Sequence, residues 1–376
     1  MSQRGLLCGL IALASACAVP ELYAQPAPAD QPIVPNPTIP ETASPSPSAT
    51  PSASPSPSAS PAGDTDPKSP QAEAGIYISD SGNHRIMFLK DMKGEGRKVL
   101  GRAGHEPGYF LHPCQIWVDP GGKIFVADRD NNRIVRMEQI NGFGWKELPG
   151  FNHPEGVASR GDEIYVADTG NNQVLVYDAE MDKKPLRTYK DPRLNHPTSL
   201  WLDQNKDLYV TCGQDPPGGR VVKLVDPADQ TGAKWEVYEG QNLKQLGFAP
   251  SQMVTLDRRL WMVDPAANRL VRVDNFQGRS AREWGGYGTN LGKFRNPAGL
   301  GLSKDGNLYV ADSGNDRIVE VTGNDPKEWH VYAGGNEGVV LRNPTSVFSW
   351  CPVPAPPPPK DEEDPKKRPK KPKPVS

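Results

Sequence analysis

One unit recurs six times in this chain, and any fold has to accommodate all six copies. Each unit is a short strand of alternating apolar residues, then a polar anchor residue, a turn of small residues, and a second strand that arginine usually opens. The anchor positions are 48, 40, 44, 52 and 48 residues apart, and they hold Asp80, Asp128, Asp168, Cys212, Asp264 and Asp312. Repeated all-β units of this length predict a propeller or a solenoid.

Proline marks a third strand in each unit and indicates how the ends of the array meet. It precedes five of the anchors by 14 or 15 residues, at Pro113, Pro154, Pro197, Pro250 and Pro297. A sixth copy, Pro344, has no anchor after it, whereas Asp80 has no proline before it. We therefore expect the strand at 345–350 to complete the first unit and close a ring, which leaves no open sheet edge.

The segments around three anchors resemble the signature of the NHL repeat family. They are Val126-Ala127-Asp128-Arg129-Asp130-Asn131-Asn132-Arg133-Ile134-Val135, the shorter Val166-Ala167-Asp168-Thr169-Gly170-Asn171-Asn172, and Val310-Ala311-Asp312-Ser313-Gly314-Asn315-Asp316-Arg317-Ile318-Val319. The resemblance covers about residues 75–351 and implies an all-β, six-bladed propeller. It departs from the pattern at Gln173, which replaces arginine, and at Cys212, which replaces aspartate. Because propellers have many functions, the resemblance implies little about this one.

Residues 1–24 are typical of an export signal. Arg4 is followed by an apolar stretch at 6–19 and a small residue at Ala24, after which we expect cleavage. The alternative is a lipoprotein box at 13–17, with Cys17 as the lipid attachment site. The apolar stretch is shorter than the about 20 residues that a membrane helix needs. The protein is therefore predicted to be secreted, periplasmic or held at the cell surface.

The composition divides the rest of the chain into three parts. Residues 25–74 are rich in proline, serine and alanine and are predicted to form a disordered linker. Residues 75–351 are predicted to form the propeller, and residues 352–376, rich in proline and lysine, are predicted to form a disordered tail. The linker and the basic tail are both candidates for surface attachment, and a closed ring is expected to be a monomer.

Four blades pair the anchor aspartate with an arginine five residues later. We interpret these pairs as fixing each hairpin, through bonds from backbone N–H groups of the turn and a bidentate contact with the guanidinium. A catalytic residue would be unique to one blade. The structural pairs are Asp80 with Arg85, Asp128 with Arg133, Asp264 with Arg269, and Asp312 with Arg317.

Histidine precedes three of the strand-opening prolines, an arrangement that suggests zinc. The residues in question are His112, His153 and His196, and the equivalents in the other units are Ala249, Asn296 and Asn343. Because histidine and asparagine alternate, we favour a shared hydrogen-bonding role. Peptidyl-hydroxyglycine amidating lyases have a similar propeller, but their zinc histidines follow the proline, where this chain has Cys114, Glu155, Thr198, Ser251, Ala298 and Thr345.

One carboxylate is expected at the head of an innermost strand. Glu155 is close to Gln115 and Gln252 in the predicted fold, and such oxygen ligands suit Ca²⁺, as in gluconolactonase-like propellers. We expect no metal or cofactor, with Ca²⁺ or Zn²⁺ as the alternative.

Only Cys114, Cys212 and Cys351 follow the export signal, and their predicted separation makes us expect three free thiols.

The long loops between units and one extended turn converge on a single face of the predicted ring, at 101–112, 213–219, 239–249 and 285–296. The preferred function is a non-enzymatic binding module for a protein, peptide or glycan. A net charge of −2 argues against nucleic acid. The alternative is a metal-dependent enzyme of the lyase or lactonase type at the channel mouth. Candidate contact residues are Tyr109, Glu155, Tyr287, Lys293 and Arg295.

Overall fold

The computed structural model describes residues 72–182, 184–213, 219–227, 234–239, 248–322, 328–334 and 340–352. The predicted export signal, most of the linker, the tail after residue 352 and most of the extended turn at 213–219 lie outside these residues. Four short 3-10 turns interrupt the strands, and the described ranges contain no α-helix. No helix in the described part of the chain is long and apolar enough to span a membrane.

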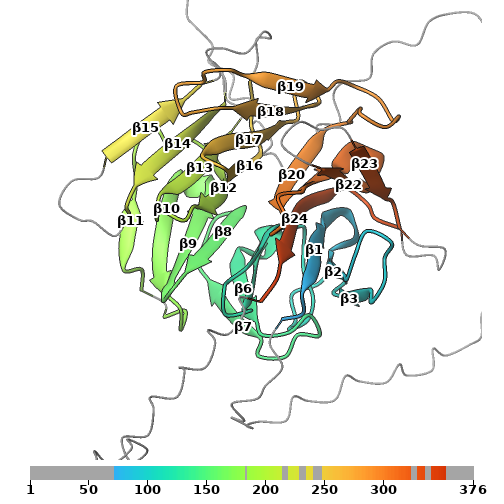
Figure 1. Ribbon diagram of the computed structural model, residues 1–376. Helices are drawn as coiled ribbons and strands as arrows, with labels where there is room; N and C mark the ends of the chain where they lie inside the picture. The colour runs from blue at the N-terminus through green and yellow to red at the C-terminus, as the bar shows by residue number, and fades with distance from the viewer. Residues whose placement is uncertain are drawn as a thin grey trace, which may run out of the picture. The chain divides into compact units, whose positions relative to one another are not determined.

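The described strands form six antiparallel sheets of four strands each, arranged as blades around a ring (Figure 1). This arrangement confirms the predicted six-bladed propeller. Blade 1 contains β24 (Pro344–Trp350), β1 (Gly75–Asp80), β2 (Arg85–Leu89) and β3 (Lys98–Leu100); blade 2 contains β4 (Pro113–Val118), β5 (Ile124–Asp128), β6 (Arg133–Met137) and β7 (Lys146–Pro149); blade 3 contains β8 (Gly156–Arg160), β9 (Glu163–Asp168), β10 (Gln173–Asp178) and β11 (Arg187–Tyr189).

The other three blades repeat this order from the innermost to the outermost strand. Blade 4 contains β12 (Pro197–Leu202), β13 (Leu208–Cys212), β14 (Arg220–Val225) and β15 (Lys234–Tyr238); blade 5 contains β16 (Gln252–Leu256), β17 (Arg259–Asp264), β18 (Arg269–Val273) and β19 (Arg282–Gly285); blade 6 contains β20 (Pro297–Leu302), β21 (Leu308–Asp312), β22 (Arg317–Thr322) and β23 (Glu328–Tyr332).

The last strand closes the ring by pairing with the first. Gly75 lies opposite Trp350, and Tyr77 lies opposite Phe348, so β24 becomes the innermost strand of blade 1. This confirms the predicted closure at Pro344. Because Gly75 and Trp350 are neighbours, the propeller begins and ends on the same face, opposite the turns that follow the anchor residues.

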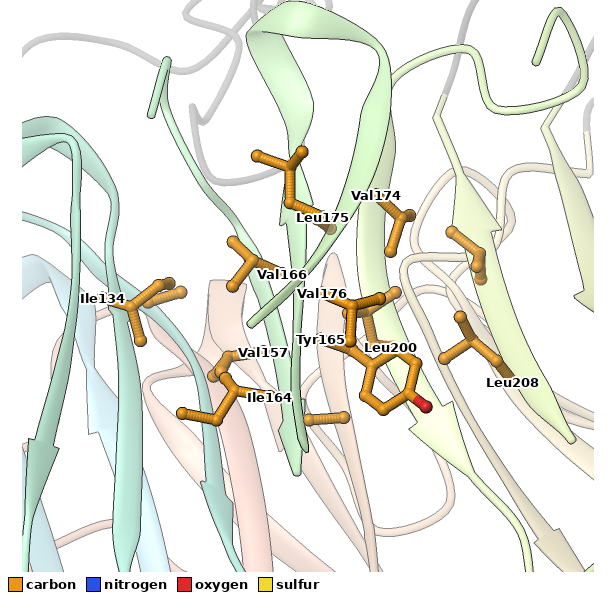
Figure 2. Packing of buried hydrophobic residues seen from close by; sticks show 14 of the residues in the cluster. Ile134, Val157, Ile164, Tyr165, Val166, Val174, Leu175, Val176, Leu200 and Leu208 are labelled. Carbon is orange, nitrogen blue, oxygen red and sulfur yellow. The ribbon is translucent and has the colours of Figure 1, made fainter. Parts of the chain in front are cut away.

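The core lies between blades, so the inner strands are buried on both sides. Figure 2 shows Ile164 and Val166 of blade 3 in a cluster that also includes Ile134 of blade 2 and Leu200 of blade 4. Aromatic residues extend this packing to the rim, where the buried Phe110 packs against Trp145, with ring centroids 5.4 Å apart, and Phe294 against Trp329 at the same separation. A blade therefore cannot be removed without exposing the apolar sides of two neighbours.

The cysteines differ in part from the prediction. Cys212 and Cys351 are free, as expected. Cys114 is disulfide-bonded, so the expectation of three free thiols is wrong at this residue. Cys212 and Cys351 are not its partner, since both are free, so the spacing among the three later cysteines could not reveal the bond.

Truncation tests the closure of the ring. A chain that ends at Asn343 lacks β24, which leaves an edge of β1 open and the apolar face of blade 1 uncovered. We expect it to lose its cooperative thermal transition and to aggregate. A chain that ends at Pro354 keeps β24 and should melt like the full-length protein by circular dichroism. Equal melting temperatures for the two chains would contradict ring closure as the source of stability.

Candidate functional site

The turns after the anchor residues and the loops that enter the next blade form one side of the ring, here called the loop face. Its longest described loops enter blade 6 at 285–296 and blade 2 at 101–112. They have the same shape, because each makes an isolated parallel bridge, between Tyr287 and Phe294 in one and between Ala103 and Phe110 in the other. The repeats thus build two copies of one protruding loop.

The anchor aspartate connects each hairpin to the loop that enters its blade. Asp128 Oδ1 accepts a 2.7 Å hydrogen bond from the backbone N–H of Leu111. Its Oδ2 accepts bonds from Asn131 Nδ2 at 2.8 Å and Arg133 Nε at 2.7 Å. Burial raises the pKa of the Asp128 carboxyl, and these hydrogen bonds offset the effect only in part. Asp80 and Asp312 make the same contacts in blades 1 and 6.

These contacts correct two details of the predicted pairs in blades 1, 2 and 6, whereas Asp264 in blade 5 does accept a backbone N–H of its own turn, from Ala267 at 3.4 Å. In blades 1, 2 and 6 the carboxylate binds the amide of a turn asparagine and an N–H of the incoming loop, rather than backbone N–H groups of its own turn. The arginine uses Nε on a single carboxylate oxygen, not a bidentate fork, because its remaining N–H groups hold the loop. Arg133 donates to the carbonyls of His105 at 2.7 Å and Tyr109 at 2.8 Å.

Neighbouring blades are joined at the last residue of the turns in the five blades whose turns the structure describes, and this residue has a left-handed backbone. His84 Nδ1 accepts the backbone N–H of His112 at 3.1 Å, and Asn132 Oδ1 accepts that of His153 at 2.9 Å. The residue before each strand-opening proline is also left-handed in five blades, with φ between 46° and 50° at His112, His153, His196, Asn296 and Asn343. Asparagine and histidine tolerate this conformation better than most residues.

The positions of these histidines around the ring therefore follow from the left-handed backbone that the residue before each proline adopts. His112 contacts the ring of His84 at 4.3 Å and places Nδ1 2.6 Å from Asp130 Oδ2. Within the described ranges no group of three or more histidine, cysteine, aspartate or glutamate residues is arranged to hold a metal ion.

A small polar cavity, here called the channel pocket, lies at the heads of the innermost strands and has a volume of about 30 Å³. Most of the polar side chains around it join blades to one another. Gln115 Oε1 accepts backbone N–H groups of Val157 and Leu200, both at 3.0 Å, and Gln252 Oε1 accepts that of Leu300 at 3.0 Å. The two amide oxygens considered as Ca²⁺ ligands are thus occupied by backbone contacts.

Glu155 is the exception in the channel pocket. Its side chain is only 2% exposed, and Oε1 lies 3.3 Å from Arg129 Nε. Neither atom has a hydrogen-bond partner among the described residues. Burial raises the pKa of Glu155 to about 8; Arg129 opposes this shift and Asp130 adds to it. The carboxyl is therefore mainly protonated at neutral pH.

The other predicted contact residues all lie on the loop face but differ in exposure. Tyr287 is 65% exposed, and its hydroxyl accepts a 2.6 Å hydrogen bond from Arg295. Lys293 is exposed and donates to the carbonyl of Gly285 at 2.9 Å. Tyr109 is half-buried beneath the guanidinium of Arg102, 4.4 Å from its ring centroid.

Four further loop-face residues were missed by the sequence reasoning: Arg102, Leu291, Val340 and Arg342. The sequence contained a signal for Arg342, which lies two residues before its proline, as Arg295 does. Exposure of Leu291 and Val340 depends on the folded loops and has no local signature.

Comparisons with known proteins agree with this architecture. Residues 151–177 and 294–320 match the NHL repeat family. A streptogramin B lyase structure is 18% identical, with 73% of this chain and 86% of that chain covered and a TM-score of 0.51. A chain of a nidogen/laminin complex is 15% identical, with 75% and 100% covered and a TM-score of 0.60. At these identities the solved structures show a similar fold alone. Curated proteins gave no match.

Removing an anchor carboxylate tests its structural role. Asp128→Ala leaves the N–H of Leu111 and part of Arg133 without a partner, and we expect a loss of about 1 to 3 kcal/mol in unfolding free energy. Asp312→Ala should cost a similar amount, since the two sites are copies. Chemical denaturation measures both. A much larger loss at one site than at the other would contradict the equivalence.

Glu155 gives the protein a pH dependence of a definite sign. Its folded pKa of about 8 exceeds the ordinary value of 4.5, so the folded state keeps a proton that the unfolded chain releases. This group therefore makes stability fall as pH rises from about 4.5 to 8. Glu155→Gln should remove that dependence and melt at a higher temperature than the parent at pH 8, with little difference near pH 4.5.

Glu163 is a matched control of opposite sign. Burial acts to raise its pKa, but hydrogen bonds from Arg187 and Tyr165 hold it below the ordinary value. Glu163→Gln should therefore lower the melting temperature at pH 8, and this loss should shrink at pH 3. If Glu155→Gln behaved like Glu163→Gln, the buried, protonated state of Glu155 would be disproved.

Proposed function

Because this chain is a six-bladed NHL-repeat β-propeller, we propose that it is an exported binding module that holds a protein ligand against its loop face. The observation that carries the proposal is the concentration of exposed apolar side chains on that face. Among described large apolar residues, Tyr287, Leu291 and Val340 are the most exposed, at 65%, 64% and 60%, and all three lie in loops that enter blades 6 and 1. Exposed apolar groups that cluster in this way are typical of interaction surfaces.

The position of the chain ends supports the same proposal. Gly75 and Trp350 pair on the face opposite the loops. The described propeller therefore begins and ends on the face opposite the loops, and its ends leave the loops free. The similar chain in a nidogen/laminin complex supports a protein ligand, since its structure is that of a complex of proteins.

The competing candidate is an enzyme at the channel mouth, and the similarity to a streptogramin B lyase is its support. Its acid would be Glu155, the carboxylate in the channel pocket. That side chain is 2% exposed, so a substrate could not reach it without rearrangement of the surrounding strands. We therefore favour the binding module.

Site-specific photo-crosslinking tests the binding module. A photoreactive phenylalanine analogue at position 287 reports contacts on the loop face, and the same analogue at Phe143, which is 45% exposed in the turn between β6 and β7 on the opposite face, is the control. We expect one protein to be crosslinked from position 287 and not from position 143. Tyr287→Ala should then weaken binding of that purified protein about tenfold, the cost of losing one well-placed aromatic contact, at an unchanged melting temperature.

Two results would contradict the proposal. Equal crosslinking from both positions would mean that the loop face is not the binding surface. Consumption of a streptogramin B by the purified protein, lost in Glu155→Gln, would favour the lyase candidate.

A further inference from the structure

Four cations lie on three consecutive loops of the loop face, and we call them the cationic arc. Lys293 and Arg295 are in the loop that enters blade 6, Arg342 is in the loop that enters blade 1, and Arg102 is in the loop that enters blade 2. None of the four has a carboxylate partner in the part of the chain that the structure describes. By contrast, the four hairpin arginines that follow an anchor aspartate are each paired with it.

Arg295 and Arg342 are held in place by the framework of the repeats. The backbone N–H of Arg295 bonds to Asp312 Oδ1 at 2.7 Å, and its carbonyl accepts the N–H of Gly314 at 2.8 Å. Arg342 makes the equivalent bonds with Asp80, at 2.7 Å, and Gly82, at 2.9 Å. The two side chains therefore project from fixed points on adjacent blades.

The turn glycines make room for these arginine side chains. A Cβ atom at Gly314 would lie 2.6 Å from Cγ of Arg295, and one at Gly82 would lie 2.9 Å from Cγ of Arg342. Blade 2 has Asp130 at the same place in the turn and Leu111 at the place of the arginine. A glycine in the turn thus occurs together with an arginine in the incoming loop in blades 1 and 6, and these two blades therefore present a cationic surface that blade 2 lacks.

Two of the arc's arginines are stacked on tyrosine. The guanidinium of Arg295 lies 5.4 Å from the ring centroid of Tyr287, and that of Arg102 lies 4.4 Å from the ring of Tyr109. Arg295 also donates to the Tyr287 hydroxyl from Nε at 3.1 Å and Nη2 at 2.6 Å, and Arg102 Nη2 donates to the hydroxyl of Tyr109. These contacts orient each guanidinium in advance and leave its remaining N–H groups for a carboxylate. Exposed acids lie beside the arc: Glu106 is in the loop that carries Arg102, and Asp316 Oδ1 accepts the N–H of Asn343, next to Arg342, at 2.7 Å. Arg295 and Arg342 are the two cations that matching backbone bonds hold in place.

We propose that the ligand of the loop face presents an acidic peptide segment with a large apolar side chain, and that its carboxylates pair with Arg295 and Arg342. This inference rests on the proposed function and names the chemistry of the partner. Leu291 and Val340, exposed in the same loops, receive the apolar side chain. A peptide can supply the aliphatic side chain that contacts Leu291 and Val340, and nucleic acid has no such group.

Fluorescence anisotropy with a labelled peptide tests the chemistry directly. The probe is a 14-residue peptide of glutamate and aspartate with two leucines, added to the full chain at low salt and in about 0.5 M NaCl, where screening is strong. We expect binding that salt weakens. The double variant Arg295→Gln, Arg342→Gln should weaken it about tenfold or more, since it removes two charge-assisted contacts.

The matched control removes two exposed positive charges from the opposite face, with Lys206→Gln in the turn between β12 and β13 and Lys304→Gln in the turn between β20 and β21. It lowers the net charge equally and should bind the peptide like the parent. Melting temperatures of both double variants, expected to be unchanged, show that the propeller is intact.

Other results would overturn the inference. Equal loss of peptide binding in both double variants would mean a response to net charge alone. Tighter binding of a single-stranded oligonucleotide or a sulfated glycan of the same charge would assign the arc to a polyanion. If the protein crosslinked from position 287 bound the arginine double variant as tightly as the parent, the binding module would stand and the acidic segment would be wrong.

Discussion

The hydrogen bonds of the anchor carboxylates are the interactions on which the loop face depends. In blades 1, 2 and 6 one oxygen holds the loop that enters the blade, while the other holds the asparagine and arginine of the turn. The arginine then reaches the carbonyls of the same loop, as Arg133 does at His105 and Tyr109. Buried charge of this kind is costly unless every oxygen is bonded, and the repeat provides those bonds.

The centre of the ring is held by a second set of polar contacts. Gln115 connects blade 2 to both blades 3 and 4, and Ser251 donates to the carbonyl of Ala298 in the next blade at 2.7 Å. These bonds occupy side chains that would otherwise be free to bind ligands. Glu155 stands apart because its carboxyl has no such role, and burial rather than a partner sets its pKa.

Because the framework is regular, the residues that hold the fold together can be told apart from the residues that are available for binding. Positions that repeat in most blades, such as the anchor aspartates, hold the fold together. Positions that differ between equivalent blades are available for binding, and the residue two before the proline illustrates this: it is Leu111 in blade 2 but Arg295 and Arg342 in blades 6 and 1. The same backbone hydrogen bond therefore positions either an apolar or a cationic side chain, and the identity of that side chain sets the chemistry of the surface.

The sequence by itself determined the six blades and the closing strand after Pro344, because these follow from a periodic pattern of apolar residues and prolines. It also located Tyr287, Lys293 and Arg295 on the loop face, since loop length shows which turns protrude.

Only the tertiary structure decided which groups meet across the ring. The N–H of Arg342 bonds to Asp80, 262 positions earlier in the chain, and Arg129 approaches Glu155 from the neighbouring blade. Such contacts depend on how closure brings distant segments together and on how far burial removes water from them. Neither ring closure nor burial is a local property, so the spacing of residues along the chain could not predict these contacts.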